Sequence, residues 1–340
     1  MDTQRPKNIT IFDVAQASGV SYSTVSRVLN GFTFVKESTR LKVLEAAEEL
    51  GYVANMQARS LAGGKSKVIG LLVPQLDNGY INEICRGIDQ ALVKVGYDLM
   101  LYTTHHEKDK EAKYVKAITN GLTDGLLLLV PLVPAAYIAM LREQNYPYVL
   151  IDQGDNAGES YIVDSTNWQG AYDATKHLLE LGHSRIAFVS GIPELSSSRD
   201  RLEGFKAALQ EYDVPFDSSL IAEGFFEAEL AIEATTYLLS LNPRPSAIFA
   251  SNDLSALGAM EAVRQAKLRI PEDISIIGFD DIPQASITYP KLTTIRQPLE
   301  QMGRVAVKLL LEQIEKPDLK PRRVTLATQL VVRDSVKQIA

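Results

Sequence analysis

The chain has 340 residues, of which 46% are hydrophobic, and it carries a formal net charge of −7. This length is too great for one small core and indicates two or three domains. The single cysteine, Cys85, excludes an internal disulfide framework and a zinc site built on cysteines, and the negative charge argues at first sight against a polyanionic partner.

The charge is unevenly distributed along the chain. Residues 1–65 hold eight Lys or Arg and six Asp or Glu, a balance of +2, so the remainder carries −9. A mildly basic head on an acidic body is typical of a protein that contacts phosphates at one end only. Because a single head of this kind binds weakly and two tethered heads bind well, the pattern predicts a homodimer.

Two segments of the sequence indicate where in the cell the protein is located. The N-terminal sequence MDTQRPKN has no apolar core of a secretory signal, which favours a cytoplasmic location. The longest uncharged stretch, residues 125–141, is interrupted by Pro131 and Pro134, so a strand, a loop and a helix explain it better than a membrane span. We therefore expect no membrane partner.

Residues 9–31, ITIFDVAQASGVSYSTVSRVLNG, predict two short helices joined by a tight turn. Thr10 and Asp13 have the spacing of a capping box, so the first helix is expected to begin at Ile11. Gly19 lies where the chain must turn sharply, a position at which glycine is unstrained. The second helix, capped by Ser21, has apolar residues on one side and polar residues on the other.

The polar side of this second helix predicts contact with DNA. Hydroxyls, an amide and a guanidinium can bond base edges and phosphates in the major groove, which is wide enough for a helix. The residues on this side are Tyr22, Ser23, Ser26, Arg27 and Asn30. An ordinary surface helix is the alternative, because short helix-turn-helix patterns also arise by chance.

This stretch and the sequence after it resemble the LacI/GalR family of bacterial transcription regulators. The resemblance implies that the second helix enters the major groove, where Tyr22, Ser23 and Arg27 contact bases. A third helix is expected at Thr39 to Leu50 and is stopped by Gly51, although Lys36 stands where the family usually has a small capping residue. The residues assigned to DNA contact are Thr10, Ser21, Tyr22, Ser23, Ser26, Arg27, Asn30, Asn55 and Leu61.

A linker, YVANMQARSLAGG, follows at residues 52–64. Asn55 can cap a short helix of Met56 to Ala62, and the glycines that follow would end it. Such a helix is too short to be stable alone but can form when another molecule orders it. The family resemblance implies that it folds on DNA as a hinge and that Leu61 of each of two chains wedges into the minor groove, which bends the duplex.

The body of the chain alternates short apolar runs with helical stretches. Apolar runs begin at Val68, Asp98, Asp124, Tyr148, Arg185, Ala247 and Ile274, and helices are expected near residues 107–121, 168–181, 199–212, 253–266 and 299–315. Fully apolar runs between amphipathic helices indicate parallel sheets covered on both faces. The resemblance implies a two-lobed body like that of periplasmic binding proteins. It also implies that the chain crosses from one lobe to the other three times, near residues 164, 294 and 326.

The predicted fold is therefore α/β. A three-helix helix-turn-helix head and a hinge helix are joined to a two-lobed periplasmic-binding-protein-like body of doubly wound parallel sheets. The expected domains are a DNA-binding domain at residues 1–54, a hinge and linker at 55–66, and an effector-binding and dimerisation domain at 67–340. Within the last, lobe 1 covers about 67–164 and 295–326, and lobe 2 covers about 165–294 and 327–340.

Polar side chains at the strand ends predict a ligand site in the cleft between the lobes, where such sheets bind ligands. A carboxylate, an amide and a guanidinium that converge there suit a polyhydroxyl ligand, and several acids disfavour an anionic one such as a phosphorylated sugar. Family positions that contact effectors match Tyr80, Ile81, Asp152, Arg199, Phe226, Asn252, Asp280 and Gln297. Arg201 is a secondary candidate, and we expect Asp253 and Asp281 to have structural roles.

Nothing in the sequence indicates catalysis. The four histidines lack zinc-ligand spacing, and no nucleophile elbow, dinucleotide fingerprint or complete phosphate loop is present, so we expect no enzyme, cofactor or metal. The expected function is a homodimeric repressor of sugar uptake or catabolism genes that binds a palindromic operator and is released by a small neutral sugar. The alternatives are a cytosolic sugar sensor that acts through protein contacts, and a regulator that uses a purine or another effector as co-repressor.

Overall fold

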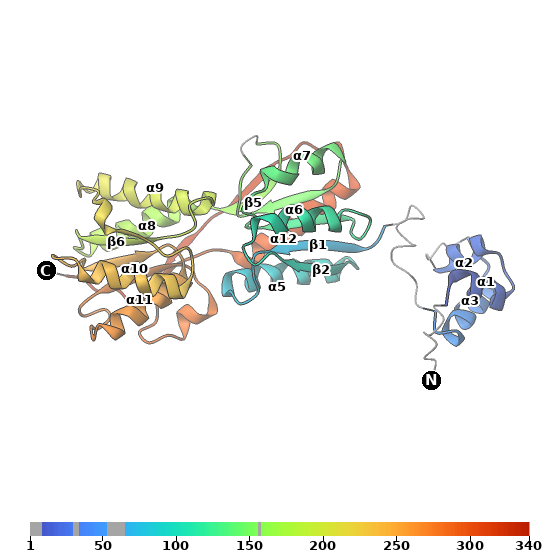
Figure 1. Cartoon of the computed structure of the whole chain (residues 1–340), viewed down its shortest axis with the longest axis horizontal. Helices are drawn as coiled ribbons and strands as arrows, with labels where there is room; N and C mark the ends of the chain where they lie inside the picture. The colour runs from blue at the N-terminus through green and yellow to red at the C-terminus, as the bar shows by residue number, and fades with distance from the viewer. Residues whose placement is uncertain (1–8, 30–33, 53–64, 156–157, 340) are drawn as a thin grey trace. The chain divides into compact units, whose positions relative to one another are not determined.

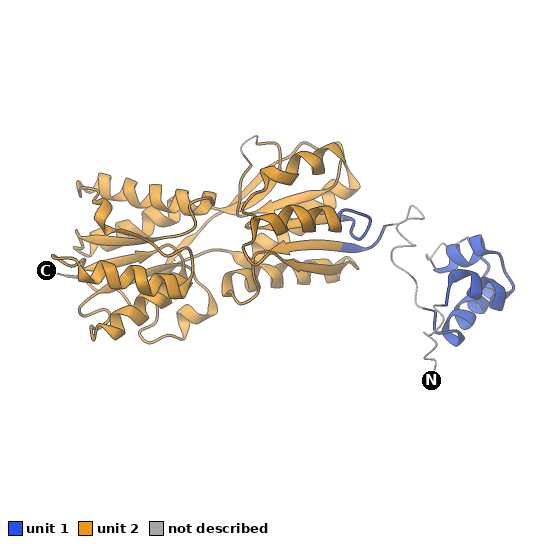
Figure 2. Cartoon of the chain, viewed as in Figure 1, with its two compact units in different colours: residues 1–68, 118–124 blue, residues 69–117, 125–340 orange. Residues whose placement is uncertain are grey.

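The computed structural model describes residues 9–29, 34–52, 65–155 and 158–339. The chain divides into two compact units, residues 1–68 with 118–124 and residues 69–117 with 125–340 (Figure 2). The predicted hinge helix and three residues assigned to DNA contact, Asn30, Asn55 and Leu61, lie outside the described residues. The predicted domain boundaries stay predictions.

The first two helices of the head begin where the sequence predicted. Helix α1 spans Ile11–Ser18 and α2 spans Tyr22–Leu29. The backbone N–H and the hydroxyl of Thr10 each donate to the Asp13 carboxylate at 2.7 Å, and Gly19 has a left-handed φ of 66°. The predicted start at Ile11 and the turn at Gly19 are therefore confirmed.

The third helix begins earlier than predicted. Helix α3 spans Glu37–Glu49, and Gly51 follows its end with a φ of 63°. The predicted start at Thr39 was wrong because no side chain caps this helix: the carbonyl oxygen of Lys36 accepts the backbone N–H groups of Thr39 and Arg40 instead. Apolar side chains shared by the three helices form the core of the head; they are Val14, Val25, Val28, Val43, Ala46 and Ala47.

The larger unit contains two six-stranded sheets, each covered by helices (Figure 1). The first sheet has the strand order β11-β5-β4-β3-β1-β2, and the second has the order β12-β10-β9-β8-β6-β7. We call the first sheet with its helices lobe 1 and the second sheet with its helices lobe 2. The paired strands run parallel wherever the register is recorded, except for β12, which is antiparallel to β10.

The elements of lobe 1 come from two parts of the chain. They are β1 (Val68–Val73), α5 (Gly79–Lys94), β2 (Asp98–Thr103), α6 (Lys108–Ile118), β3 (Gly125–Leu129), α7 (Ala135–Glu143), β4 (Tyr148–Ile151), β5 (Tyr161–Ser165), α12 (Leu299–Glu315) and β11 (Arg323–Leu326). Strands β1, β3 and β4 are buried along their whole length, as their uninterrupted apolar runs predicted. Helix α12 has the predicted bounds.

The elements of lobe 2 lie mainly in the second half of the chain. They are α8 (Asn167–Glu180), β6 (Ile186–Ser190), α9 (Ser196–Glu211), the short 3₁₀ helix η1 (Ser218–Leu220), β7 (Ile221–Glu223), α10 (Ala228–Ser240), β8 (Ala247–Ala250), α11 (Asp253–Gln265), β9 (Ser275–Asp280), the 3₁₀ helix η2 (Pro283–Ser286), β10 (Thr293–Arg296) and β12 (Gln329–Val331). Helix α9 begins three residues before the predicted position. Strands β11 and β12 are separated by only two residues but belong to different sheets.

The chain passes between the sheets three times, after β5, after β10 and after β11. Helix α12 returns to lobe 1 and packs closely on α5. A Cβ atom on Gly303 would lie 2.3 Å from the carbonyl oxygen of Ile84, and one on Gly87 would lie 2.1 Å from that of Glu300, so only glycine allows this approach. In the described part of the chain, we find no helix with the length and apolar character that crossing a membrane requires.

Candidate effector site and DNA-reading helix

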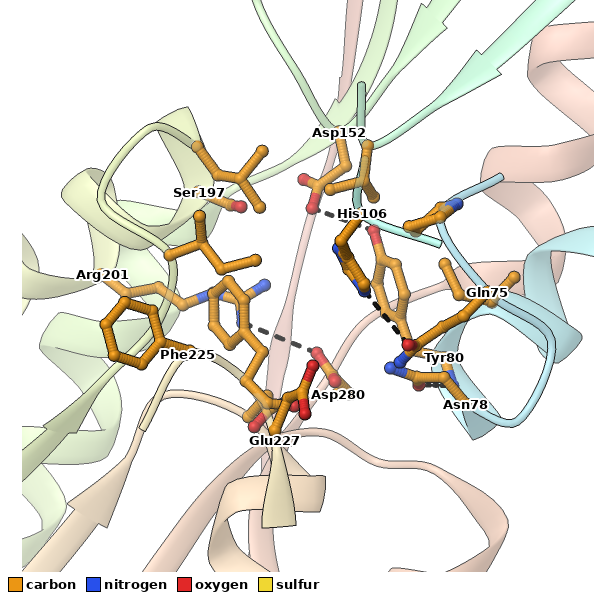
Figure 3. Close-up of a pocket in the computed structure, with 17 residues that line it drawn as sticks. Gln75, Asn78, Tyr80, His106, Asp152, Ser197, Arg201, Phe225, Glu227 and Asp280 are labelled. Carbon is orange, nitrogen blue, oxygen red and sulfur yellow. Dashed lines mark hydrogen bonds and ion pairs between the residues drawn. The ribbon is translucent and has the colours of Figure 1, made fainter. Parts of the chain in front are cut away.

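A cavity lies between the two lobes (Figure 3). The lobe 1 side of the cavity is formed by the loops after β1, β2, β3 and β4 and by the start of α5. The lobe 2 side is formed by residues near α9, α10 and α11 and by the end of β9. The lining residues are Pro74, Gln75, Asn78, Tyr80, Ile81, His106, Val130, Asp152, Ile192, Leu195, Ser197, Arg201, Phe225, Phe226, Glu227, Asn252 and Asp280.

The structure brings six of the eight residues assigned to effector contact into this cavity wall. They are Tyr80, Ile81, Asp152, Phe226, Asn252 and Asp280. They come together because the carboxyl ends of the parallel strands in both lobes face the same cleft. Arg199 and Gln297 are not in the wall.

The expectation that Arg199 lines the cavity is corrected by the position of helix α9. Ser197 and Arg201 are four residues apart and share the helix face that lines the cavity, so Arg199 points away from it. The exposed guanidinium of Arg199 donates to the carbonyl oxygens of Pro193 and Glu194, each at 2.9 Å. Arg201, the secondary candidate, supplies the cavity guanidinium.

Arg201 is 2% exposed and links several parts of the site. Its Nε donates to Asn167 Oδ1 at 2.9 Å, and its Nη1 donates to the carbonyl oxygen of Ser251 at 2.6 Å and lies 3.7 Å from Asp280 Oδ1. The guanidinium carbon is 3.8 Å from the centre of the Phe279 ring and 5.5 Å from that of Phe226. This arrangement fixes a buried cation by hydrogen bonds, an ion pair and aromatic contact.

Gln297 supports the cavity from behind. Its Nε2 donates to Asp280 Oδ1 at 2.7 Å, and its Oε1 accepts the hydroxyl of Ser165. Gln297 is not among the lining residues, so it orients the Asp280 carboxylate from behind the cavity wall.

The carboxylate of Asp152 is held in a second set of bonds. It accepts the hydroxyl of Tyr80 at 2.9 Å and the amide of Asn167 at 3.2 Å. Because a carboxylate has about four lone-pair positions, each of the two cavity aspartates retains acceptor capacity for a ligand. Asn167 also bonds Arg201, so one connected network joins Asp152, Arg201 and Asp280.

Asn252 and Phe226 are coupled through the backbone. Asn252 caps α11 by accepting the backbone N–H of Ser255 at 2.8 Å, and its amide donates to the carbonyl oxygen of Phe226 at 3.1 Å. The Phe226 ring lies against Gly191, where a Cβ atom would be 2.0 Å from Cζ of the ring. Gly191 therefore makes room for this ring at the cavity wall.

Asp253 and Asp281 have the structural roles expected for them. Asp253 accepts the backbone N–H of Ile282 at 2.9 Å and the hydroxyl of Thr294. Asp281 accepts Arg296 at 2.7 Å and Arg333 at 2.6 Å.

Several cavity residues were missed by the sequence analysis. Gln75, Asn78, His106, Ser197 and Glu227 all lie in the wall, and His106 bonds Gln75 at 3.1 Å. All except Ser197 lie in loops that follow strands or at the first residues after them, so the edge of the sheets was the signal that could have found them. Among the described residues, no group of three or more His, Cys, Asp and Glu is placed to hold a metal ion.

Backbone strain is concentrated around the cavity. Five non-glycine lining residues, His106, Val130, Asp152, Phe225 and Phe226, have φ between 48° and 65°, and Asp280 has a φ of 126°. Such conformations are costly for residues with a Cβ atom and persist only where the surrounding structure enforces them. The strain occurs where strands end at the cavity, as is common at functional sites.

Burial raises the pKa values of the acids in the cavity. The pKa of Asp280 rises to about 7, because burial outweighs the opposing effects of Arg201 and the bond from Gln297. Burial also raises the pKa of Asp152 and, with the negative charge of Asp152, that of Tyr80. Near neutral pH, Asp280 is therefore divided between an acceptor-only carboxylate and a neutral carboxyl group that also donates.

The raised pKa of Asp280 predicts a pH dependence of stability. An unfolded aspartate has a pKa of about 3.9, so between about pH 4 and 7 the folded chain binds one proton more than the unfolded chain at this position. The stabilisation from this proton is complete below about pH 4 and is lost as the pH rises to about 7, with a slope of up to about 1.4 kcal/mol per pH unit.

We expect the free energy of unfolding of wild type, minus that of Asp280→Asn, to fall from about pH 5 to 7 and to level off above it. Urea titrations at several pH values measure both free energies. A difference that stays constant across this range would contradict the raised pKa.

The outward face of α2 carries the residues assigned to DNA contact. Tyr22, Ser23 and Arg27 are exposed, and the rings of Tyr22 and Phe12 stack with centroids 4.9 Å apart. The Ser21 side chain caps α2, because its Oγ accepts the backbone N–H of Thr24 at 3.3 Å. Thr10 is bonded to Asp13, and Ser26 is half-buried. Thr10 and Ser21 are exposed as well, and Ser21 Oγ lies 3.0 Å from Ser23 Oγ.

These features define a class of protein. A helix-turn-helix head presents a polar helix, and a two-lobed α/β body encloses a cavity for a small molecule, as expected of a ligand-responsive DNA-binding regulator. Residues 10–55 match the family model described as bacterial regulatory proteins, lacI family, and residues 175–336 match the periplasmic binding protein-like domain.

Relatives with known names cover nearly the whole chain. The HTH-type transcriptional repressor PurR of Vibrio vulnificus is 38% identical over 97% of this chain and 99% of its own length. The repressor of the same name from Photobacterium profundum is 36% identical over the same shares. The chain belongs to the lacI family of bacterial regulatory proteins, and it is a DNA-binding transcriptional repressor and not an enzyme.

Solved structures show the same fold. The lac repressor dimer bound to operator and the anti-inducer ONPF has a TM-score of 0.85 at 30% identity and covers 97% of this chain and 100% of that one. The CelR–cellobiose complex has a TM-score of 0.72 at 32% identity, with 96% and 99% covered. A LacI family regulator from Enterococcus faecium with bound ribose has a TM-score of 0.73 at 31% identity, with 80% and 100% covered. These matches confirm the predicted fold class.

Proposed function

We propose that the chain acts in the cytoplasm as a homodimer, binds a near-palindromic operator through two heads, and is released from it by a small neutral sugar. The observation that carries the choice of effector is the cavity, in which two carboxylates, Asp152 and Asp280, and the guanidinium of Arg201 are held in fixed positions. Hydroxyl groups of a sugar are both donors and acceptors, so neighbouring hydroxyls can bond a carboxylate or a guanidinium in pairs.

The charge of the cavity supports a neutral ligand. The lining contains Asp152, Asp280 and Glu227 against one guanidinium, Arg201, with His106 as the remaining titratable base. A phosphorylated ligand would place its negative charge beside these carboxylates, which is unfavourable. The Phe226 ring, fixed against Gly191, offers an apolar face of the kind that packs on the C–H face of a sugar ring.

Two of the solved relatives are complexes with sugars, cellobiose in one and ribose in the other, which supports the same class of effector here. The lac repressor relative is a dimer on its operator, which supports two heads on one duplex. For operator contact we propose Thr10, Ser21, Tyr22, Ser23, Ser26, Arg27, Asn30 and Asn55, with Leu61 as the wedge in the minor groove.

A calorimetric screen of monosaccharides and oligosaccharides tests the effector. We expect one sugar to bind at one site per chain and to weaken operator binding by roughly 5- to 150-fold, the usual range of allosteric coupling. Purine bases and nucleosides form the second arm of the screen. A purine that binds and tightens operator binding, with no response to any sugar, would overturn the sugar proposal and establish co-repression instead.

A further inference from the structure

A second cavity, distinct from the effector cavity, lies between the lobes. It is lined by residues 132–134 and four residues of α7 from lobe 1, by Gln153, Gly154 and Asp155 after β4, and by Glu194 and Arg199 from lobe 2. Gln153 stands at the boundary of the two cavities, because its neighbour Asp152 lines the effector cavity while Gln153 lines the second one.

The side-chain amide of Gln153 bonds both lobes. Its Nε2 donates to the carbonyl oxygen of Pro131 in lobe 1 at 3.2 Å and is 3.4 Å from that of Glu194 in lobe 2. Its Oε1 accepts the backbone N–H of Ser196, the first residue of α9 in lobe 2, at 3.1 Å. Gln153 is 5% exposed, so water does not readily replace these bonds.

The atoms that Gln153 joins flank the wall of the effector cavity. Pro131 follows the lining residue Val130, and Glu194 and Ser196 flank the lining residue Leu195. A second inter-lobe contact supports the same edge: Lys108 Nζ donates to Glu194 Oε1 at 2.8 Å, although both side chains are half exposed. An exposed ion pair contributes little, so the buried amide is the stronger link.

We propose that Gln153 is a strap that holds the two lobes closed along this edge of the effector cavity. It is a positioning residue: it sets the fraction of chains whose lobes are closed before any effector binds. The bonds fix Val130 and Leu195 at the separation that the closed cavity requires. The consequence for effector affinity rests on the proposed function, because affinity falls in proportion to the fraction of binding-competent chains.

The matched variants are Gln153→Met and Gln144→Met. Methionine has nearly the volume of glutamine but makes none of these bonds, nor the one that Gln153 Oε1 accepts from the backbone N–H of Gly154 at 3.2 Å, so a role in packing alone predicts no change in Gln153→Met. Gln144 is an exposed residue after α7, and its replacement controls for the added thioether. Circular dichroism and thermal unfolding verify that both variants fold.

Distances between spin labels measure lobe opening directly and without any effector. Spin labels are attached to two introduced cysteines, Ala136→Cys on α7 in lobe 1 and Glu203→Cys on α9 in lobe 2. Both positions are exposed, and the native cysteine is removed by Cys85→Ala. Labelled chains are diluted with unlabelled chains so that only distances within one chain contribute. Helices α7 and α9 flank the second cavity, so loss of the strap should lengthen the distance between them.

We expect wild type and Gln144→Met to give the same short-distance distribution. Gln153→Met should gain a longer-distance population, with the ratio of open to closed chains raised about tenfold or more, since each lost bond shifts the equilibrium several-fold. A distribution in Gln153→Met equal to that of wild type would overturn the strap. If a sugar binds wild type, its affinity for Gln153→Met should fall in proportion to the fraction of chains that the distances show to be closed. If no sugar binds, the proposed effector is wrong, but the spin-label distances still test whether Gln153 holds the lobes closed.

Discussion

We expect the Arg201→Ala variant to lose the response to effector and to be strongly destabilised. Removal of the guanidinium leaves the buried Asp280 without its cation and the carbonyl oxygen of Ser251 without its donor. Loss of one partner of a buried ion pair costs about 3–5 kcal/mol, which is a large part of the stability of a domain. Urea unfolding measures the stability, and calorimetry with the effector found for wild type measures binding.

The neighbouring arginine on the same helix is the control. Arg199 is exposed and bonds only carbonyl oxygens of its own loop among the contacts recorded for the described residues, so Arg199→Ala should unfold within about 0.5 kcal/mol of wild type and keep its effector binding. Arg201→Lys separates charge from geometry, because lysine keeps the positive charge but not the planar fork. Effector binding lost in Arg199→Ala and retained in Arg201→Ala would reverse the assignment.

We expect Arg27→Ala to weaken operator binding by about 1–3 kcal/mol, or roughly 5- to 150-fold. Arg27 is exposed on the outer face of α2, while Val25 and Val28 on the inner face are buried in the core of the head, so its removal should leave the fold intact. Effector binding should not change. Fluorescence anisotropy with a labelled operator duplex measures the affinity.

Arg27→Lys distinguishes reading of bases from attraction to phosphates. Lysine preserves the charge and hence the salt-dependent, non-specific part of binding, but it lacks the fork that bonds guanine through two donors. We therefore expect Arg27→Lys to bind random duplex as wild type does and to lose preference for the operator. Equal operator preference in wild type and Arg27→Lys would show that Arg27 contacts only the backbone.

The head shows what local sequence determines. The capping pair Thr10 and Asp13 and the glycine at position 19 are short-range signals, and both are in place. The start of α3 carried no such signal, since neither Ser38 nor Thr39 caps it, and packing of Val43 against the other helices sets its position. Local rules therefore succeeded where a side chain bonds its own helix end and failed where tertiary packing decides.

The cavity shows the limit of the same reasoning. Residues at strand ends, such as Asp152 and Asp280, could be placed because parallel strands end at one edge. To choose between Arg199 and Arg201, one must know which face of α9 lines the cavity. The start of α9 at Ser196 has no side-chain cap, so no local signal marked where this helix begins. The bonds of Gln153 join residues 131, 153 and 196, which no pattern within the sequence connects.

The most direct test of the whole account is an operator titration with the full chain. Duplexes enriched from a random pool by the wild-type protein are titrated by fluorescence anisotropy, with and without the sugar found by calorimetry. We predict that the enriched duplexes are inverted repeats, that two chains bind each duplex, and that the sugar lowers the affinity at least fivefold. Binding that is equal for enriched and random duplexes, or that no small molecule alters, would contradict a ligand-gated dimeric repressor.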